Sequence, residues 1–358
     1  MRILVLGGTA FLSAEIVRSA VAAGHDVTCL ARGSAAVPPP GASWLRADRS
    51  LGANAYAGAE GEWDAVVDVA RDPVPATEAL EALAARAAHW TFVSSCSVYA
   101  DASVPGADED ASLLPALPAG TPSTADTYGE SKVAIEEATM QAAGGKAHLC
   151  RAGLIGGPGD SSDRYGYWPA RFARDSRPVL VPATDNSPTQ VIDVRDLAAW
   201  ILRAAEKGVT GPLNAVGGQV PFGTFIAASR EAADHRGRVI PAAEAWLAHQ
   251  GVNYWAGPDS LPLWLPPGHG GFMARSNSAA LRAGLQLRPW QETLAATLTD
   301  ERTRGLDRPR KAGLSPETEA RLAEKLPQSL CGRPPNYAAA ILSPENDTWR
   351  YLVGPSRR

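Results

Sequence analysis

The first two dozen residues combine an apolar run, a glycine turn and a helical pattern. Residues 2–6 read Arg-Ile-Leu-Val-Leu, which is typical of a strand buried on both faces of a sheet. Gly7 and Gly8 follow at once, and apolar side chains then recur at helical spacing over residues 11–21 until Gly24 ends the pattern. The pattern predicts a strand, a tight turn and a helix, a unit that can hold a pyrophosphate at the helix N-terminus.

The alternation of strand-like and helix-like segments continues through the first half of the chain. Apolar strand patterns are expected at residues 26–30, 43–47, 65–70, 91–95 and 147–151, and helices at 77–88 and 127–144. Strands that alternate with helices predict the α/β class, with a doubly wound parallel (Rossmann) sheet. The long segment 100–125, rich in Pro, Ala and acids, is either disordered or a lid over a site.

After residue 160 the pattern becomes less regular and more aromatic. Further elements are expected at 163–177, 189–194, 196–206 with Asp196 as the helix cap, 212–216, 222–233 and 316–325. The arginines that follow Asp163 either grip a substrate diphosphate or form a solvated basic face. We therefore expect a dinucleotide-binding domain from residues 1–165 and 188–216, a smaller C-terminal substrate-binding lobe from 166–187 and 217–330, and a tail from 331–358.

The amino-acid composition limits the kinds of molecule that the chain is expected to bind. The chain has 358 residues, 45% of them hydrophobic and 20% charged, and a net charge of −4, so it offers no basic field for a nucleic acid. No apolar run is long enough to span a membrane. Three of its four cysteines fall in expected buried strands, which favours a reduced, cytoplasmic protein. The expected partner is a small-molecule substrate, with neither nucleic acid nor membrane.

A tyrosine and a lysine at helical spacing are the candidate acid/base residues. Tyr128 and Lys132 are four residues apart at the start of an expected helix, so both project from one face. A tyrosine hydroxyl, with a reference pKa near 10, needs a nearby cation to act as a base at neutral pH. Lys132 can supply that charge and bond a nicotinamide ribose, while Ser95 at the end of the fifth strand can hold a carbonyl or alkoxide oxygen.

The ends of the second and third strands suggest the form of the cofactor. Ala31 and Arg32 stand where an NAD-preferring site usually has a carboxylate, and an arginine there accommodates the 2′-phosphate of NADP. NADP is therefore the expected cofactor, with NAD possible. Asp48 and Arg49 follow the third strand, where an adenine amino group could be met.

Five segments carry a resemblance to a known family: Gly-Gly-Thr-Ala-Phe-Leu at 7–12, Ser-Ser before Val-Tyr at 94–99, Tyr-Gly-Glu-Ser-Lys at 128–132, and residues 151–160 and 192–198. The chain resembles the short-chain dehydrogenase/reductase superfamily, in its extended branch of NAD-dependent epimerases and dehydratases, and within that an atypical Gly-Gly-Thr-x-Phe-Leu subgroup. The resemblance implies hydride transfer at a carbonyl or secondary alcohol of a nucleotide sugar or natural-product intermediate. It implies Tyr128 as acid/base, Lys132 as its partner and ribose anchor, and Ser95 as the substrate-positioning residue.

The predicted site follows from these segments. The expected cofactor-binding residues are Gly7, Thr9, Ala10, Phe11, Leu12, Arg32, Asp48, Arg49, Val69, Ala70, Ser94, Tyr128, Lys132, Gly153 and Ile155. The expected substrate-binding residues are Arg71, Ser97, Arg164 and Trp168, and no metal site is expected.

Positions at which this chain departs from the family pattern help to distinguish between the possible reactions. Sugar 4,6-dehydratases carry an Asp-Glu pair directly after the fifth-strand hydroxyl residue, and this chain has Cys96 and Ser97 there. Reductase or epimerase is therefore favoured over dehydratase, and Cys96 is either a packing residue or a thiol acid/base. The alternative function is a non-catalytic nucleotide-binding sensor or RNA-binding module on the same fold. The alanine-rich helices at 77–88 and 127–144 are the faces that build a symmetric dimer in the resembled family, so a homodimer is expected.

Overall fold

The computed structural model describes residues 1–34 and 36–326, and it divides into two compact units. The first contains Met1–Ile155, Gln190–Gly218 and Gly271–Arg288, and the second contains Gly156–Thr189, Gln219–Gly270 and the described residues from 289 to 326. Residues 271–288 thus belong to the first unit rather than to the lobe expected from the sequence. They are held there by backbone bonds, such as that from the Gly271 N–H to the Ala102 carbonyl (2.8 Å). The expected tail 331–358 lies outside the described residues.

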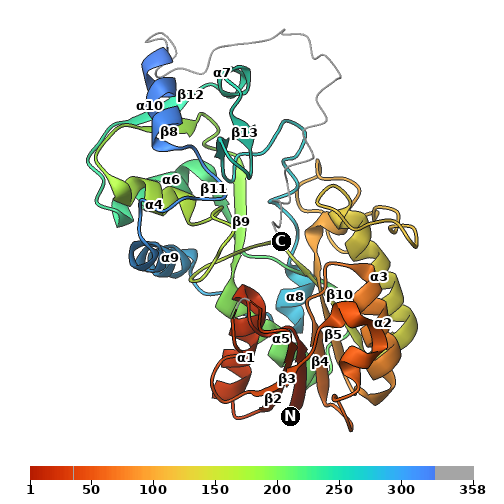
Figure 1. Cartoon of the computed structure of the whole chain (residues 1–358). Coiled ribbons are helices and arrows are strands. Elements are labelled where there is room, and N and C mark those ends of the chain that lie inside the picture. Colours follow the sequence, from red (N-terminus) through yellow and green to blue (C-terminus); the bar gives the residue numbers. More distant parts are fainter. Residues whose placement is uncertain (35, 327–358) are drawn as a thin grey trace. The chain divides into compact units, whose positions relative to one another are not determined.

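The centre of the first unit is a seven-stranded parallel sheet in the order β10-β6-β5-β4-β1-β2-β3 (Figure 1). Its strands are β1 (Arg2–Leu6), β2 (Asp26–Ala31), β3 (Ser43–Arg46), β4 (Ala65–Asp68), β5 (Trp90–Ser95), β6 (Ala147–Ala152) and β10 (Gly211–Ala215). The doubly wound parallel fold expected from the alternating pattern is confirmed. All seven carboxyl ends meet at one edge, where α/β proteins bind ligands.

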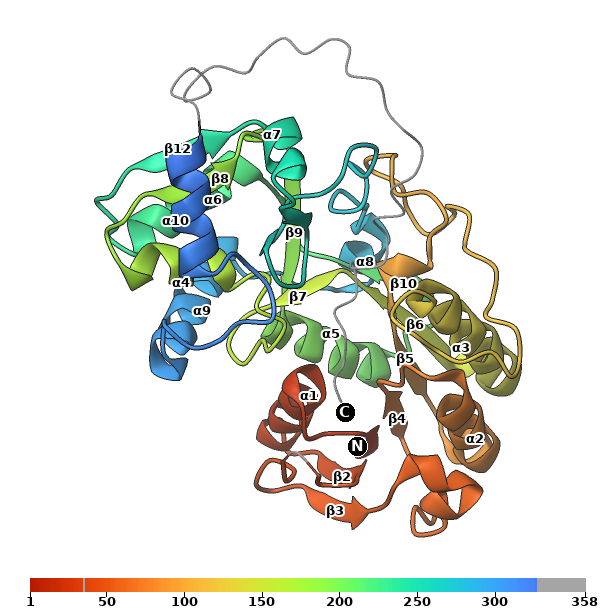
Figure 2. The ribbon, with the colours of Figure 1, turned by 45° about the horizontal axis from the view of Figure 1, so that its top comes forward.

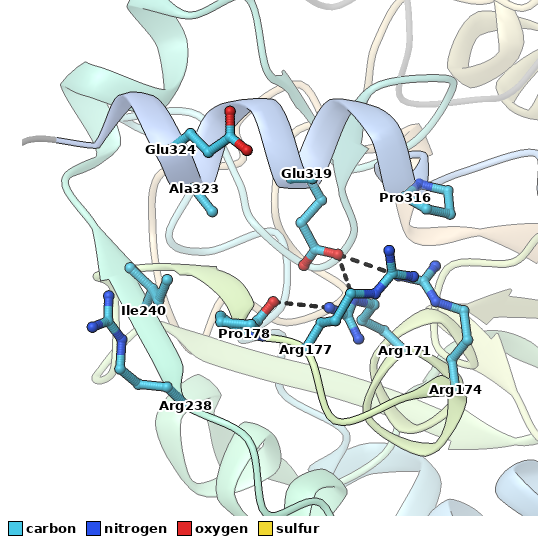
Figure 3. Close-up of a pocket in the computed structure, with 11 residues that line it drawn as sticks. Arg171, Arg174, Arg177, Pro178, Arg238, Ile240, Pro316, Glu319, Ala323 and Glu324 are labelled. Carbon is cyan, nitrogen blue, oxygen red and sulfur yellow. Dashed lines mark hydrogen bonds and ion pairs between the residues drawn. The ribbon is translucent and has the colours of Figure 1, made fainter.

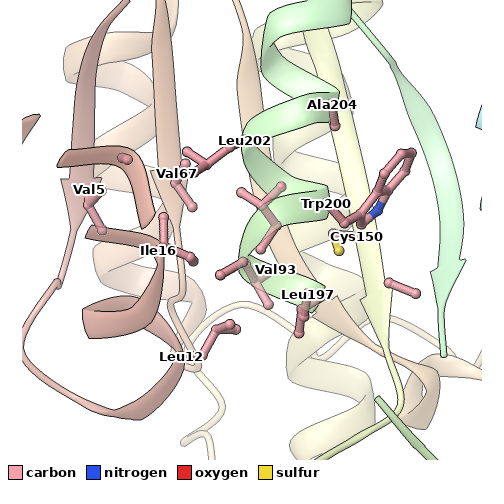
Figure 4. Close-up of a cluster of buried hydrophobic side chains, with 14 of the residues drawn as sticks. Val5, Leu12, Ile16, Val67, Val93, Cys150, Leu197, Trp200, Leu202 and Ala204 are labelled. Carbon is pink, nitrogen blue, oxygen red and sulfur yellow. The ribbon is translucent and has the colours of Figure 1, made fainter. Parts of the chain in front are cut away.

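Helices cover both faces of this sheet (Figure 2). The helices α1 (Phe11–Ala22) and α5 (Val194–Lys207) pack together on one face, and α2 (Pro73–Leu83) and α3 (Tyr128–Ala143) on the other. Between the sheet and the first pair, Ile16, Val67 and Leu197 are fully or almost fully buried (Figure 4). Burial of this apolar layer is the main term that stabilises the unit.

Local capping explains where two helices begin. The helix α2 starts four residues before the expected 77, because the Asp72 carboxylate accepts a bond from the Val74 N–H and Pro73 suits a first helical turn. The expected cap of α5 was wrong by one turn. Asp193 caps α5 by accepting from the Arg195 N–H, whereas Asp196 lies inside the helix and binds Arg288 (2.8 Å).

The second unit has smaller sheets than the first unit. Its main elements are α4 (Tyr167–Arg174), β8 (Val179–Pro182), α6 (Phe222–Ala232), β12 (Val239–Ala242), α7 (Glu244–His249), β13 (Asn253–Tyr254), β14 (Ser260–Leu261), α9 (Trp290–Arg304) and α10 (Pro316–Lys325). The strands β8 and β12 pair in parallel, as do β13 and β14. The remaining elements among the described residues are β7 (Leu154–Gly156), β9 (Pro188–Asp193), β11 (Gln219–Pro221), α8 (Ser278–Ala283) and the 3₁₀ helices η1 (Arg49–Tyr56), η2 (Ala84–Arg86), η3 (Cys96–Val98) and η4 (Gly144–Lys146).

The arginine-rich helix α4 is tied into the second unit rather than presented as a uniform basic face. Arg174 and Arg177 bind Asp175. Arg171 is buried and donates to Glu319 on α10 (2.5 Å), and Arg174 donates to the same carboxylate (Figure 3). These side chains line a cavity of about 360 Å³ between α4, β8, β12 and α10. The carboxylates of Glu319 and Asp175 thus neutralise much of the positive charge of these arginines, for which a solvated basic face was one of the two expectations.

None of the helices in the described part of the chain has the length and apolar character that a membrane span requires.

Candidate active site

The turn after β1, the predicted pyrophosphate position, has a backbone that only glycine readily adopts. Gly7 and Gly8 have φ values of 131° and 96°, which other residues rarely adopt. A Cβ on Gly8 would lie 2.6 Å from the Cys29 sulfur, and one on Gly7 would lie 3.2 Å from Val69. Only glycine therefore lets the turn pass so close to β2, and Val69 reaches the same turn.

The helix α1 starts directly after this turn, with Thr9 and Ala10 as the connection and Ala10 as the N-cap residue. The first backbone N–H groups of a helix, here from Phe11 and Leu12, have no carbonyl partner within the helix. They form, with the positive end of the helix dipole, an anion site at the carboxyl edge of the sheet. The chemistry of this turn is compatible with a diphosphate, because the helix start offers N–H donors and the two glycines add no side chain to it.

Arg32 and Asp48 come together where β2 and β3 end. Arg32 is exposed directly after β2. Hydrogen bonds from the Ser50 N–H and hydroxyl lower the pKa of Asp48, and the positive charge of Arg32 adds to this effect. The two predicted cofactor residues therefore lie near each other, with the Arg32 guanidinium available for an anionic group.

Arg49 has a different role from the one expected. Its guanidinium donates to both carboxylate oxygens of Asp68 (2.8 and 3.0 Å) and to the Pro75 carbonyl (2.8 Å). Asp68 ends β4, so this bidentate pair fastens η1 and the start of α2 to the sheet. In the structure Arg49 is a structural residue beside the predicted adenine position, and its forked donors are engaged.

Tyr128 and Lys132 lie in the first two turns of α3. Lys132 is buried, and its Nζ donates to the carbonyl oxygens of Ala70 (2.6 Å) and Val93 (2.8 Å). The same nitrogen is 5.8 Å from the centre of the Tyr128 ring. Burial lowers the pKa of Lys132 from 10.5 to about 7, and the charge of Asp68 opposes this shift. The ammonium is thus confined between the ends of two strands and the ring of Tyr128.

Ser95 lies at the end of β5, next to the start of α3. Its hydroxyl accepts a bond from the Ser97 N–H and donates to the Ser97 hydroxyl, both at 3.1 Å. A Cβ on Gly129 would collide with the Ser97 carbonyl oxygen, so glycine there lets the first turn of α3 pack on this loop. The structure therefore brings the elements that carry Ser95, Ser97 and Tyr128 together.

Arg71 approaches the same tyrosine from the loop after β4. Its guanidinium carbon lies 5.7 Å from the centre of the Tyr128 ring, and its side chain is exposed. Two cations, Arg71 and Lys132, therefore approach one phenol. An exposed arginine here can bind an anionic group of a substrate.

Cys96 is unsuited to acid/base work. It is 4% exposed, its thiol donates to the Arg151 carbonyl (3.4 Å), and burial raises its pKa to about 12. A thiolate is therefore disfavoured there near neutral pH, and the packing alternative explains this residue.

The other expected residues divide between the two units. Gly153, after β6, leaves space for Val216, because a Cβ there would lie 2.9 Å from that side chain, and Ile155 is the last residue of its segment of the first unit. Arg164 and Trp168 belong to the second unit. Trp168 is completely buried, and its indole N–H donates to the Pro262 carbonyl (2.7 Å), so its contacts are those of a core residue. Arg164 lies over the Trp255 ring, 5.3 Å from its centre.

The sequence analysis did not identify two charged residues behind the site. Glu136, one helical turn beyond Lys132 on α3, accepts from Ser94 (2.5 Å) and from Arg151 (2.8 Å). Both charged residues are buried, at 3% and 4% exposure. The i, i+4, i+8 spacing of Tyr128, Lys132 and Glu136 was the available signal, because it places all three on one face of the helix.

A glycine cradle, a strand-end serine and a Tyr-x-x-x-Lys pair on one parallel sheet define a dinucleotide-binding protein of the extended short-chain dehydrogenase type. The family model for the NAD dependent epimerase/dehydratase family matches residues 3–216. The chain belongs to that family. No sequence among the curated proteins is significantly similar to it.

Solved structures of epimerases have the same fold. The UDP-glucose 4-epimerase of Thermotoga maritima with UDP-glucose aligns with a TM-score of 0.62 at 16% identity, covering 85% of this chain and 99% of that one. The enzyme WbmH of Bordetella bronchiseptica in complex with NAD+ aligns with a TM-score of 0.59 at 18% identity, covering 84% and 98%. The UDP-glucuronic acid 4-epimerase of Bacillus cereus in complex with NAD gives 0.62 at 14% identity, covering 85% and 99%. These identities establish the likeness of fold alone.

Proposed function

We propose that this chain is a nucleotide-sugar epimerase, which inverts a secondary alcohol of a UDP-hexose by hydride transfer with Tyr128 as the acid/base residue. One observation carries the proposal: Tyr128 and Lys132 share a face of α3, and the first turn of that helix packs on the loop of Ser95. Membership of the epimerase/dehydratase family and the UDP-sugar epimerases among the structural neighbours support the substrate class. The missing Asp-Glu pair favours epimerase over dehydratase.

The side chains have separate roles in this proposal. Ser95 holds the reacting oxygen of the sugar, and the phenolate form of Tyr128 takes the proton of the alcohol, becomes the phenol and later returns that proton. Lys132 supplies positive charge beside the phenol and a donor for the ribose of the cofactor. When bound, a nicotinamide dinucleotide accepts and returns the hydride. Arg71 holds an anionic group of the substrate, because it is exposed and within 5.7 Å of the Tyr128 ring centre.

The cofactor in this proposal is a nicotinamide dinucleotide whose diphosphate binds at the Gly7–Gly8 turn and the start of α1. Two observations bear on its form. Arg32 is exposed at the end of β2, where it can pair with a 2′-phosphate, and this supports NADP. Two of the structural neighbours named above, the Bordetella bronchiseptica and Bacillus cereus enzymes, were solved with NAD, which supports the unphosphorylated form. Direct comparison of the two affinities decides between them.

The test is interconversion of UDP-glucose and UDP-galactose by the full chain, followed by proton NMR in D₂O with NAD or NADP added. Hydride return within the site predicts an epimerised product that keeps hydrogen at the inverted carbon. Deuterium at that carbon would contradict hydride transfer. Tight cofactor binding without turnover of UDP-hexoses or UDP-hexuronic acids would favour the non-catalytic sensor instead.

A further inference from the structure

Behind the proposed trio, one buried carboxylate joins α3 and β5, the two elements that carry the trio, to the neighbouring strand β6. Glu136 on α3 accepts from the Ser94 hydroxyl on β5 (2.5 Å) and from Nε and Nη2 of Arg151 on β6 (3.0 and 2.8 Å). Ser94 and Arg151 are direct neighbours in the register of the two strands. Ser94 immediately precedes Ser95, so the carboxylate is anchored one residue from the proposed substrate-positioning hydroxyl.

The ion pair also fixes the loop that follows β5. Arg151 donates to the hydroxyl of Tyr99 (3.1 Å) and to the Glu109 carbonyl (3.3 Å). The Tyr99 hydroxyl donates to Asn214 on β10 (2.6 Å), whose own N–H donates to the Glu109 carboxylate (2.7 Å). Helix, three strands and loop are thereby connected through groups that are almost all buried.

A buried ion pair contributes little net stability, because the cost of removing both charges from water offsets their attraction. What such a pair does supply is geometry, since each of its donors must meet the carboxylate in one direction. In α3, the residues at i, i+4 and i+8 are Tyr128, Lys132 and Glu136. Holding Glu136 in place therefore fixes the rotation of α3 about its axis and its position along that axis. The directions of the Tyr128 and Lys132 side chains are fixed with it.

We propose that Glu136 is a positioning residue for the Ser95, Tyr128 and Lys132 trio, acting through its simultaneous contacts with Ser94 and Arg151. A second effect is electrostatic. The charged groups that face Lys132 are Asp68 and Glu136, which favour its ammonium form, and Arg71, which opposes it. Removing the charge of Glu136 therefore makes Lys132 easier to deprotonate. The catalytic part of this inference rests on the proposed function, and the geometric part does not.

The first experiment is amide hydrogen exchange on the full chain without cofactor, comparing Glu136→Gln with Glu137→Gln. Glu137 is the next residue of α3, is exposed and has no hydrogen-bond or ion-pair partner among the described residues, so it is a matched control. Glu136→Gln should raise exchange on the order of tenfold in residues 93–99 and 128–136 and leave α1 and α5 unchanged. Unchanged exchange, or an equal rise in every segment, would overturn the proposal.

The second experiment uses turnover of UDP-hexose by the same variants. Glu136→Gln should lower kcat by ~10–100-fold with KM changed little, and should move the alkaline limb of the kcat–pH profile to lower pH. Glu137→Gln should match the parent protein in both. A Glu136→Gln enzyme with the parent kcat and profile would overturn the positioning role. If the parent chain itself turns over no UDP-sugar, the proposed function has failed, and the exchange experiment still decides the geometric role.

Discussion

Lys132 donates a 2.6 Å hydrogen bond to the carbonyl oxygen of Ala70, at the point where the chain leaves β4. A second bond, to Val93 of β5, fixes the same ammonium from the neighbouring strand. Among the described residues no carboxylate forms an ion pair with Lys132, and burial makes its ammonium form less favourable than it is in water. This arrangement gives the proposed site a titratable cation close to neutral pH.

The pH dependence of cofactor binding should report that cation. Because the pKa of Lys132 is lowered to about 7 by burial, its positive charge is present below pH 7 and is lost as the pH rises above it. An anionic dinucleotide should therefore bind more weakly at pH 8.5 than at pH 6. Lys132→Met should weaken binding and remove this dependence. Titration of NADH fluorescence at several pH values is the measurement, and a pH-independent affinity in the parent chain would contradict the prediction.

Arg32 should determine the preference between the two cofactors. Its guanidinium can pair with a 2′-phosphate, and Ala31 offers no competing carboxylate, so NADPH should bind more tightly than NADH. Arg32→Ala should weaken NADPH and leave NADH nearly unchanged. Equal affinities for the two cofactors in the parent chain would refute this assignment.

His148 should make the fold sensitive to acid. It is fully buried on β6 against Trp200, and burial lowers its pKa from 6.5 to about 3. The unfolded chain takes up a proton near pH 6.5 and the folded chain does not, so stability falls as the pH drops from 6.5 towards 3. By pH 4.5 this difference is on the order of 3 kcal/mol.

His148→Leu should therefore flatten the loss of Tm between pH 7 and pH 4.5. The control is His249→Leu, because His249 is an exposed residue of α7. Thermal melts across this pH range are the measurement. Identical pH slopes in the parent and His148→Leu would show that another group is responsible.

The chain should form a homodimer through α2 and α3. These helices pack together, and Val74 and Met140 leave 62% and 42% of their surface exposed on them. Joining two copies would bury these side chains. Light scattering at micromolar concentration should give twice the chain mass, and a Val74→Glu, Met140→Glu variant should give the monomer. A monomeric parent chain would contradict the assembly.

The sequence predicted the parts of the fold that depend on local patterns. Apolar runs and glycine turns indicated the strands of the sheet, and the helix expected near residues 316–325 is present as α10. Contacts between segments that are distant in the sequence could not be predicted from these local patterns. Nothing local shows that Arg49 is engaged by Asp68, or that residues 271–288 pack with the first unit. The spacing of Glu136 from Tyr128 and Lys132 was visible in the sequence, but its pairing with Arg151 was not, because that ion pair joins a helix and a strand that are distant in the chain.

Replacement of Tyr128 by phenylalanine tests the central claim most directly. The change keeps the ring and its contacts with Arg71 and Lys132 but removes the only group proposed to exchange a proton with the sugar oxygen. The measurement is the steady-state rate of UDP-hexose epimerisation by Tyr128→Phe and the parent chain, with cofactor affinity determined alongside. The account predicts a ~10²–10⁴-fold lower kcat with cofactor affinity nearly unchanged. A Tyr128→Phe enzyme that keeps most of its activity would contradict it.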